Sequence, residues 1–174
     1  MKLTGLLAAA LLLASNLLAS LAGATGPGDS IIPLSAFPRE PIVVETRSAR
    51  RHTFEAWRAE TDAARAQGLM FVRDIRPDQA MIFVYEPPQM VAMWMKNTLL
   101  PLDMLFVDAA GCVVRTVHDA RPGLLDTIGA GAPVALVVEL KGGTTRALGI
   151  DTGDRVRRPG ADWPADGLPC TGTR

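Results

Sequence analysis

Short apolar segments that end at glycine, proline or aspartate recur along most of this sequence. Such segments, rich in β-branched and aromatic residues and closed by turn-forming residues, are typical of β-strands. We expect strands at residues 42–44, 52–59, 81–85, 90–95, 104–107, 112–117, 134–140 and 155–157. No stretch carries a long helical period. The sequence therefore predicts a mainly β fold, a small single-domain β-barrel or sandwich of about seven short strands with one short helix.

That helix is expected directly after the strand at residues 52–59. Thr61 and Asp62 are favourable N-cap residues, and the alanine-rich residues 63–67 favour helix. Gly68 follows at the position where glycine commonly ends a helix. Residues 69–71 would then anchor the end of the helix to the core.

The N-terminus has the features of a secretory signal peptide. Lys2 precedes an apolar run at residues 6–13, and the Ala-Gly-Ala at residues 22–24 fits a cleavage site. We therefore expect cleavage after Ala24 and a periplasmic or secreted protein with no stable membrane insertion. The alternative is a retained anchor, because residues 3–21 approach the length of a membrane-spanning helix. Polar residues at positions 15 and 16 interrupt that run and favour cleavage.

Composition divides the chain into four segments. Residues 1–24 are the signal peptide, residues 25–50 a linker or N-terminal arm, residues 51–158 the β domain, and residues 159–174 a Pro/Gly-rich tail. Removal of the signal peptide would leave 150 residues with 17 basic and 18 acidic side chains. Because a net charge near −1 does not attract polyanions, we expect no nucleic-acid partner.

Two cysteines, Cys112 and Cys170, remain in the exported chain. An even number of cysteines in an oxidising compartment favours a disulfide, which would tie the tail to the strand that begins at Cys112. The alternative is two free thiols, since the sequence does not give the distance between them.

Several motifs of the β domain resemble those of one known family. They are Gly68-Leu69-Met70-Phe71, Asp78 with Met81-Ile82-Phe83, Trp94-Met95-Lys96-Asn97-Thr98, Pro101-Leu102-Asp103, Val138-Glu139-Leu140, and Gly149-Ile150 before Gly153-Asp154. This set resembles the bacterial and archaeal "domain of unknown function 192" family over residues 53–156. The resemblance implies a compact β-rich domain that is often exported, and it implies no established activity.

Three positions depart from the pattern of that family. Ala80 stands where the family usually has glycine, and Met93 where it usually has phenylalanine. Val72 stands where an arginine often follows the first motif, with Arg73 one place later. The resemblance therefore carries over no site that depends on that arginine.

Polar residues are densest, within an apolar context, at residues 94–103. We consider Trp94, Lys96, Asn97, Thr98 and Asp103 a candidate ligand-binding site at a strand end, with the indole as an apolar wall. The alternative is a polar corner in which these side chains bond the local backbone and fix the turn into the next strand.

Glu139 is an acidic residue within an otherwise apolar strand and is a further candidate. An unpaired buried carboxylate costs several kcal/mol, so we expect Glu139 to pair with Lys96 or with an arginine. Such a pair is either a structural ion pair or half of an acid–base arrangement.

These residues are compatible with three functions. The first is a non-enzymatic binding or accessory module, without a cofactor, for a small ligand, a glycan or a peptide. The second is a hydrolase of an envelope polymer that uses Lys96 with Asp103 or Glu139. The third is Cu(I) handling, because thioethers bind Cu(I) and because Met93 and Met95 share one strand face.

The sequence lacks the motifs that are typical of several other kinds of functional site. His52 and His118 are isolated from other ligands at chelating spacing, so no zinc site is expected and no metal ligands are assigned apart from the copper hypothesis. The sequence also has no serine in a G-x-S-x-G elbow and no glycine-rich phosphate loop before a helix.

Overall fold

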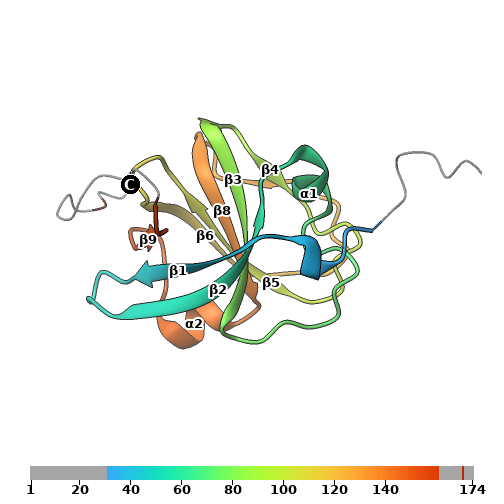
Figure 1. Ribbon diagram of the computed structural model, residues 1–174. Helices are drawn as coiled ribbons and strands as arrows, with labels where there is room; N and C mark the ends of the chain where they lie inside the picture. Colours follow the sequence, from blue (N-terminus) through green and yellow to red (C-terminus); the bar gives the residue numbers. More distant parts are fainter. Residues whose placement is uncertain (1–30, 161–169, 171–174) are drawn as a thin grey trace, which may run out of the picture. The chain divides into compact units, whose positions relative to one another are not determined.

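The computed structural model describes residues 31–160 and residue 170, which Figure 1 shows in colour. The predicted signal peptide at residues 1–24, and most of the predicted tail at residues 159–174, lie outside the described residues. The described residues belong to one compact unit, which begins at Ile31. Within that part of the chain no helix is long and apolar enough to cross a membrane.

Strands dominate the described part of the chain. They are β1 (Arg39–Glu45), β2 (Arg51–Ala59), β3 (Gln79–Gln89), β4 (Ala92–Met93), β5 (Leu102–Val107), β6 (Val113–Ala120), β7 (Ile128–Gly129), β8 (Val134–Lys141) and β9 (Arg155–Arg157). The helices are short: the 3-10 turn η1 (Leu34–Ala36), α1 (Asp62–Gln67) and α2 (Thr144–Leu148). The prediction of a mainly β fold is confirmed.

Strand β1 lies inside residues 25–50, which the sequence assigned to a linker or arm. The strand expected at residues 42–44 is present and extends through Pro41 and the charged ends of β1, with Ile42 and Val44 fully buried. Pro41 pairs with Glu55 of β2 on one side, while on the other side β9 reaches only Val43–Glu45. Pro41 therefore faces an open edge of the sheet, where its missing N–H is tolerated.

Two further elements differ from the prediction. The apolar run at residues 90–95 forms only the two-residue strand β4, because the N–H of Met95 bonds to the carbonyl of Leu124 (2.9 Å) in a loop. Helix α2 was not predicted, since its sequence begins with two threonines, which are weak helix formers. Gly143 and Gly149, both with positive φ, bound this helix.

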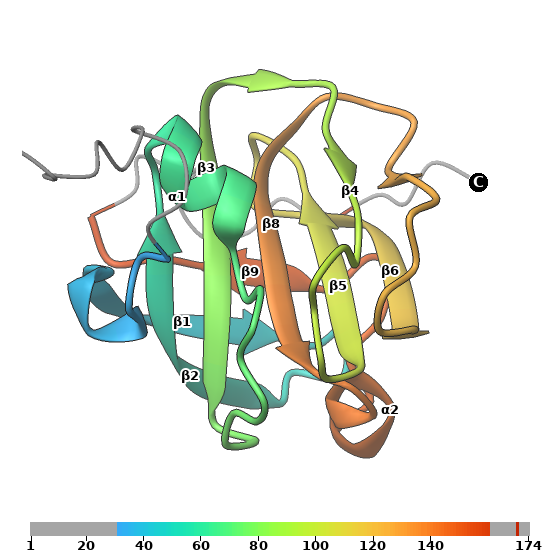
Figure 2. The ribbon, with the colours of Figure 1, turned by 90° about the vertical axis from the view of Figure 1, so that its right-hand side faces the viewer.

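Seven strands form one sheet in the order β6-β5-β8-β3-β2-β1-β9. Neighbours are antiparallel except β2 and β3, which run parallel and are connected through α1. The sheet curls into a half-barrel (Figures 1 and 2). Its two edge strands, β6 and β9, come together at one point. At this junction the N–H of Val113 donates to the carbonyl of Asp154, and that of Val156 to the carbonyl of Gly111, both at 2.8 Å.

A disulfide lies beside the junction of the sheet ends. Cys112 immediately precedes β6 and forms an isolated bridge with Arg155 of β9. Its sulfur is bonded to that of Cys170, with the two Cα atoms 5.4 Å apart. This is the pairing expected from the sequence, and it fastens Cys170 to the start of β6.

Each face of the sheet buries its own hydrophobic cluster. In β3, Ile82 and Val84 belong to one cluster and Phe83 and Tyr85 to the other, as the two-residue period of a strand requires. The first cluster lines the inside of the curl, because it includes residues from both ends of the strand order. The second lies on the outer face and is covered by η1, α1, β4 and β7. Figure 2 shows α1 and β4 on this side of the sheet.

Candidate functional site

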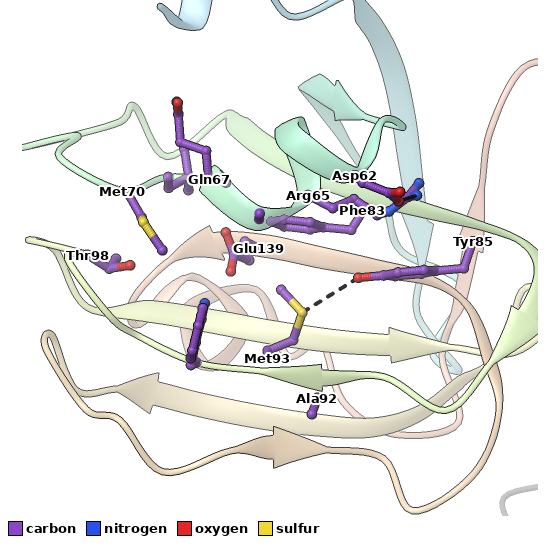
Figure 3. A pocket seen from close by; sticks show the side chains of 14 residues that line it. Asp62, Arg65, Gln67, Met70, Phe83, Tyr85, Ala92, Met93, Thr98 and Glu139 are labelled. Atoms are coloured by element: carbon purple, nitrogen blue, oxygen red, sulfur yellow. Dashed lines mark hydrogen bonds and ion pairs between the residues drawn. The ribbon is translucent and has the colours of Figure 1, made fainter. Parts of the chain in front are cut away.

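A pocket of about 260 Å³ opens on the outer face, between α1, β3, β4 and β8 (Figure 3). Phe83, Tyr85 and Trp94 contribute aromatic rings, Met70 and Met93 contribute thioethers, and Glu139 contributes a carboxyl group. We call it the Glu139 pocket. It combines apolar walls with a few polar groups, which is typical of small-molecule sites.

Helix α1 forms one wall of the pocket and is fixed by local signals. The side chain of Thr61 caps its N-terminus by accepting a hydrogen bond from the N–H of Ala64 at 3.2 Å. Gly68 ends the helix with a φ of 51°, a conformation that favours glycine. A Cβ at Gly68 would lie 2.9 Å from Cζ of Phe83. Glycine therefore allows the Phe83 ring to pack against the end of α1.

Two of the sequence motifs meet beside the pocket. Met70 and Thr98 form an antiparallel bridge, and the N–H of Phe71 donates to the carbonyl of Asn97 at 2.9 Å. Phe71 and Asn97 both have positive φ, of 64° and 56°. This tight pairing places Met70 and Thr98 together in the pocket wall.

Glu139 projects into the pocket from β8. It is only 4% exposed, and its Oε2 is buried without a hydrogen-bond partner among the residues that the structure describes. Its neighbours on the adjacent strands are Met81 of β3 and Met104 of β5, neither of which has a side-chain donor. Because burial disfavours the charged form, it raises the pKa of Glu139 to about 8.

The expected pairing of Glu139 with Lys96 or an arginine is therefore wrong for the described residues. The turn at Asn97 carries Lys96 outward, and its Nζ lies 5.4 Å from the centroid of the exposed Trp94 ring. Arg65 lines the pocket, but its guanidinium pairs with Asp62 at 2.6 Å.

Tyr85 faces the same space as Glu139. Its hydroxyl donates to Sδ of Met93 at 3.8 Å, and the guanidinium carbon of Arg65 lies 5.5 Å from its ring centroid. Burial, with a smaller contribution from the charge of Glu139, raises the pKa of Tyr85 to about 12, although Arg65 opposes the shift. Tyr85 is therefore a neutral phenol at physiological pH, with oxygen lone pairs available to a ligand.

The candidate residues at positions 94–103 separate into two groups. Trp94 and Thr98 line the pocket, with Trp94 45% exposed. Lys96 and Asn97 do not line it, and the amide of Asn97 instead donates to Sδ of Met70 at 3.9 Å. Residues 94–98 thus form a polar corner whose first and last residues, Trp94 and Thr98, reach the pocket.

Asp103 was predicted as a site residue, but its carboxylate is fully used by the fold. The carboxylate is 0% exposed. It accepts hydrogen bonds from the N–H groups of Asp119 (2.8 Å), Gly143 (3.2 Å) and Thr145 (2.7 Å), and from the Thr145 hydroxyl (2.7 Å). The Thr145 hydroxyl also contacts Nδ1 of His118 at 2.8 Å. Asp103 therefore anchors the N-terminal end of α2 to β5 and β6.

The methionines occupy three different environments. Met81, Met95 and Met104 are fully buried, Met90 is 64% exposed, and Met70 and Met93 line the pocket. Met93 and Met95 do not form the predicted accessible copper site, because Met95 is fully buried in the core. Across residues 31–160 and 170, no group of three or more His, Cys, Asp or Glu side chains is arranged to hold a metal.

A second, wider concavity of about 650 Å³ lies between β2, the end of β8 and α2. Phe54 and Leu148 are among its walls, and Lys141 at its edge is paired with Asp74 at 2.7 Å. None of the candidate residues from the sequence lines it. We therefore regard the Glu139 pocket, which holds an unpaired buried acid, as the candidate functional site.

Most of the pocket residues were not identified as site candidates from the sequence, Met70, Phe83 and Tyr85 among them. Met93 was named only in the copper hypothesis. Alternation along residues 81–85 places Phe83 and Tyr85 on one strand face. A strand that is apolar on both faces gives no sign of which face meets a cavity. One signal was present, because Met93 is a position at which this chain departs from the family pattern.

Fold and site together define a small curled β domain with a lateral pocket that has a helix as one wall and contains a buried acid. The family model described as "Uncharacterized ACR", DUF192, matches residues 43–158. The chain therefore belongs to the DUF192 family, as the resemblance of its motifs suggested.

Two solved structures are similar to this chain over most of their length. One is a protein from Sinorhizobium meliloti 1021 with a provisional description as a transcription regulator. It is 38% identical, with a TM-score of 0.69 over 70% of this chain and 95% of that chain. The other, from Novosphingobium aromaticivorans DSM 12444, is described as a protein of unknown function. It is 36% identical, with a TM-score of 0.69 over 74% of this chain and 91% of that chain. No curated protein matches the chain significantly.

Proposed function

We propose that this DUF192 protein is a non-enzymatic binding module that holds a small ligand in the Glu139 pocket. The observation that carries the proposal is the buried Oε2 of Glu139, which has no partner among the described residues. An unpaired buried carboxyl costs several kcal/mol of stability. A ligand that supplies the missing hydrogen bond explains why such a group lines an open cavity.

The dimensions of the pocket restrict the ligand. Its volume of about 260 Å³ lies just below the range of roughly 300–1,000 Å³ that holds drug-sized molecules. The pocket therefore takes a fragment-sized molecule, or one sugar or one side chain of a longer glycan or peptide. Phe83 and Met93 offer the apolar surface against which its carbon skeleton packs.

The geometry favours binding over the hydrolase alternative. An acid–base pair would require Lys96, or Asp103, to converge with Glu139 on open space. Lys96 instead lies over the Trp94 ring, and Asp103 accepts four hydrogen bonds within the fold. Glu139 is therefore left without a second catalytic group among these candidates.

We do not extend to this chain the description of the Sinorhizobium meliloti protein as a transcription regulator. Lys and Arg together number 18 in the full sequence, and Asp and Glu together also number 18. A chain without excess positive charge lacks the electrostatic attraction on which most nucleic-acid binding depends. We propose no nucleic-acid partner.

A thermal-shift screen of soluble fragments, sugars and short peptides tests the proposal. A ligand present at about 100 times its dissociation constant should stabilise the protein by about 2.7 kcal/mol. Met70→Trp would fill the pocket, because the partly buried Met70 side chain points into it beside Thr98 and Glu139 (Figure 3). Ala109→Trp adds the same ring at an exposed loop position away from the pocket and serves as the control. Stabilisation that is lost in Met70→Trp and kept in Ala109→Trp supports the proposal, whereas stabilisation kept in both variants contradicts it.

Cu(I) binding is a second candidate, because Met70 and Met93 line the same pocket as Glu139 (Figure 3). Competition with a chromophoric Cu(I) chelator would measure it. Met70→Leu and Met93→Leu should each weaken Cu(I) binding, while Met90→Leu, at an exposed position outside the pocket, should not. Equal competition by all four proteins would exclude this candidate.

We also propose that the protein acts outside the cytoplasm. The support is the signal-peptide pattern of residues 1–24 and the disulfide between Cys112 and Cys170, a bond that persists in oxidising compartments. Mass spectrometry of the protein recovered from the periplasmic fraction should show loss of residues 1–24. Recovery of the uncleaved chain from the membrane fraction would instead identify a retained anchor.

A further inference from the structure

The charge balance of the Glu139 pocket indicates which ligand would fit it. The charged side chains that line it are Asp62, Arg65 and Glu139. Asp62 and Arg65 neutralise each other at 2.6 Å, and Arg65 also donates to the carbonyl of Val84 at 2.9 Å. Glu139 is therefore the one carboxyl group in the described lining without a partner.

The groups around Glu139 do not supply a cation. On the neighbouring strands it faces Met81 and Met104, which do not titrate. From β3, Tyr85 faces it as a neutral phenol, and from α1 the guanidinium of Arg65 is committed to Asp62. A positive charge beside Glu139 would have to come from a ligand.

The hydrogen-bonding capacity of the pocket favours a donor. The Tyr85 hydroxyl gives its proton to Met93 Sδ, and the Thr98 hydroxyl gives its proton to the carbonyl of Lys96 at 3.4 Å. Both oxygens keep free lone pairs, as does the ionised carboxylate of Glu139. An ammonium group has only donors to offer, so it matches this arrangement.

The aromatic walls also suit a cation. Two rings that line the pocket already have a cation over them: Trp94 has Lys96 at 5.4 Å, and Tyr85 has Arg65 at 5.5 Å. These contacts are of the cation–π type, in which the electron-rich ring face attracts positive charge. A ligand that places its nitrogen at Glu139 would approach the same set of rings.

We propose that the ligand of the Glu139 pocket is a small organic ammonium ion, with its nitrogen on the Glu139 carboxylate and its carbon skeleton against Phe83 and Met93. This inference rests on the proposed binding function and adds the chemical class of the ligand. Binding would ionise Glu139. Because burial holds the pKa of the empty site at about 8, binding below that pH releases the carboxyl proton to the solvent.

Isothermal titration calorimetry with three probes of similar size tests this inference: benzylamine, benzyl alcohol and benzoate. Benzylamine should bind most tightly, and its affinity should rise about tenfold per pH unit from about pH 6 to about pH 8. Titrations in two buffers with different ionisation enthalpies should show release of one proton per benzylamine bound. Neither of the other probes should release a proton.

Two variants complete the test. Glu139→Gln should weaken benzylamine binding at least tenfold and abolish proton release, while leaving any binding of benzyl alcohol unchanged. Glu55→Gln removes the same charge from an exposed position on β2 and should behave as the wild type. Circular dichroism and the retained binding of fragments from the screen would show that the variants are folded.

The outcomes distinguish the inference from the proposed function. Equal affinity for benzyl alcohol and benzylamine, or benzoate binding that weakens as the pH rises, would overturn the ammonium inference and leave a binding pocket. If all three probes fail while other fragments bind in a manner sensitive to Met70→Trp, the ammonium inference alone would be overturned. Failure of the probes and of the whole screen would overturn both.

Discussion

At the residue scale, Glu139 and Asp103 show two ways of burying a carboxylate on neighbouring strands. Asp103 on β5 receives four hydrogen bonds from the fold, whereas the Oε2 of Glu139 on β8 receives none from the described residues. The first arrangement is complete without a ligand. The second is incomplete, and this difference makes Glu139 the functional candidate and Asp103 a structural residue.

Glu139→Gln should change how stability depends on pH. The pKa of Glu139 is raised from 4.5 to about 8 in the folded protein. Between these values the unfolded chain has lost the proton that the folded chain keeps, so stability falls as pH rises and levels off above about 8. At about 1.4 kcal/mol per pKa unit, the wild type should lose several kcal/mol that Glu139→Gln retains. Urea unfolding of both proteins from about pH 5 to about pH 9 measures this difference; parallel pH profiles would contradict it.

Asp103→Asn should destabilise the protein without altering the pocket. The amide keeps one acceptor oxygen but turns an NH₂ group toward two of the donors that now bond the carboxylate. Loss of two bonds to a buried charge should cost about 3 kcal/mol or more. Denaturant unfolding gives the cost, and benzylamine titration below the transition should show unchanged affinity. Near-wild-type stability with lost binding would assign Asp103 to the site after all.

At the scale of elements, the pocket depends on how α1 ends and where β3 passes beneath it. Gly68 ends the helix in a backbone conformation that most residues avoid. Because it has no side chain, the Phe83 ring packs directly against the backbone there. The bridge between Met70 and Thr98 then holds the segment after α1 against the loop after β4. The pocket is therefore a gap between fixed elements and not a groove within a flexible loop.

Gly68→Ala should lower stability and pocket occupancy together. The substitution combines an unfavourable positive φ, worth about 1–3 kcal/mol, with a Cβ only 2.9 Å from the Phe83 ring. Gly123→Ala is the matched control, because its φ is 73° and nothing lies within 4 Å of the added Cβ. Urea unfolding should show a larger loss for Gly68→Ala, and benzylamine binding should weaken only in that variant. Equal losses would show that the Phe83 contact contributes nothing.

At the scale of the whole molecule, the two edge strands of the curled sheet, β6 and β9, come together. Backbone hydrogen bonds join Val113 to Asp154 and Val156 to Gly111, and the disulfide between Cys112 and Cys170 lies next to them. The pocket lies on the outer face, among elements that the disulfide does not touch. Stability and binding should therefore respond differently to loss of the disulfide.

Replacing both cysteines by alanine should destabilise the protein by about 4 kcal/mol, the chain-entropy value for a bond that closes a loop of this length. The sequence separation of the bonded cysteines is 58 residues. Reducing agent should lower the urea midpoint of the wild type to that of the double variant and leave the variant unchanged. Benzylamine affinity should be the same in both proteins under native conditions. An effect of the reducing agent on the double variant would point to a different cause.

The sequence by itself determined the mainly β class, the helix at residues 63–67 with its cap, and the family; it favoured the cysteine pair, and the structure shows the bond. These features depend on local pattern, namely apolar segments, capping residues and specific motifs. Glu139, Trp94 and Thr98 were also recognised as candidates, since a polar residue in an apolar context is visible in the sequence.

Only the tertiary structure decided what each of these residues does. Whether a buried carboxylate is paired depends on residues that are distant in the sequence. Asp103 accepts a hydrogen bond from Thr145, whereas Glu139 lies opposite Met81 and Met104, which have no side-chain donor. The turn at Asn97 directs Lys96 away from the pocket and over Trp94. The burial of a side chain, its pairing and the shape of the pocket all depend on such contacts between distant parts of the chain. A local sequence pattern therefore does not predict them.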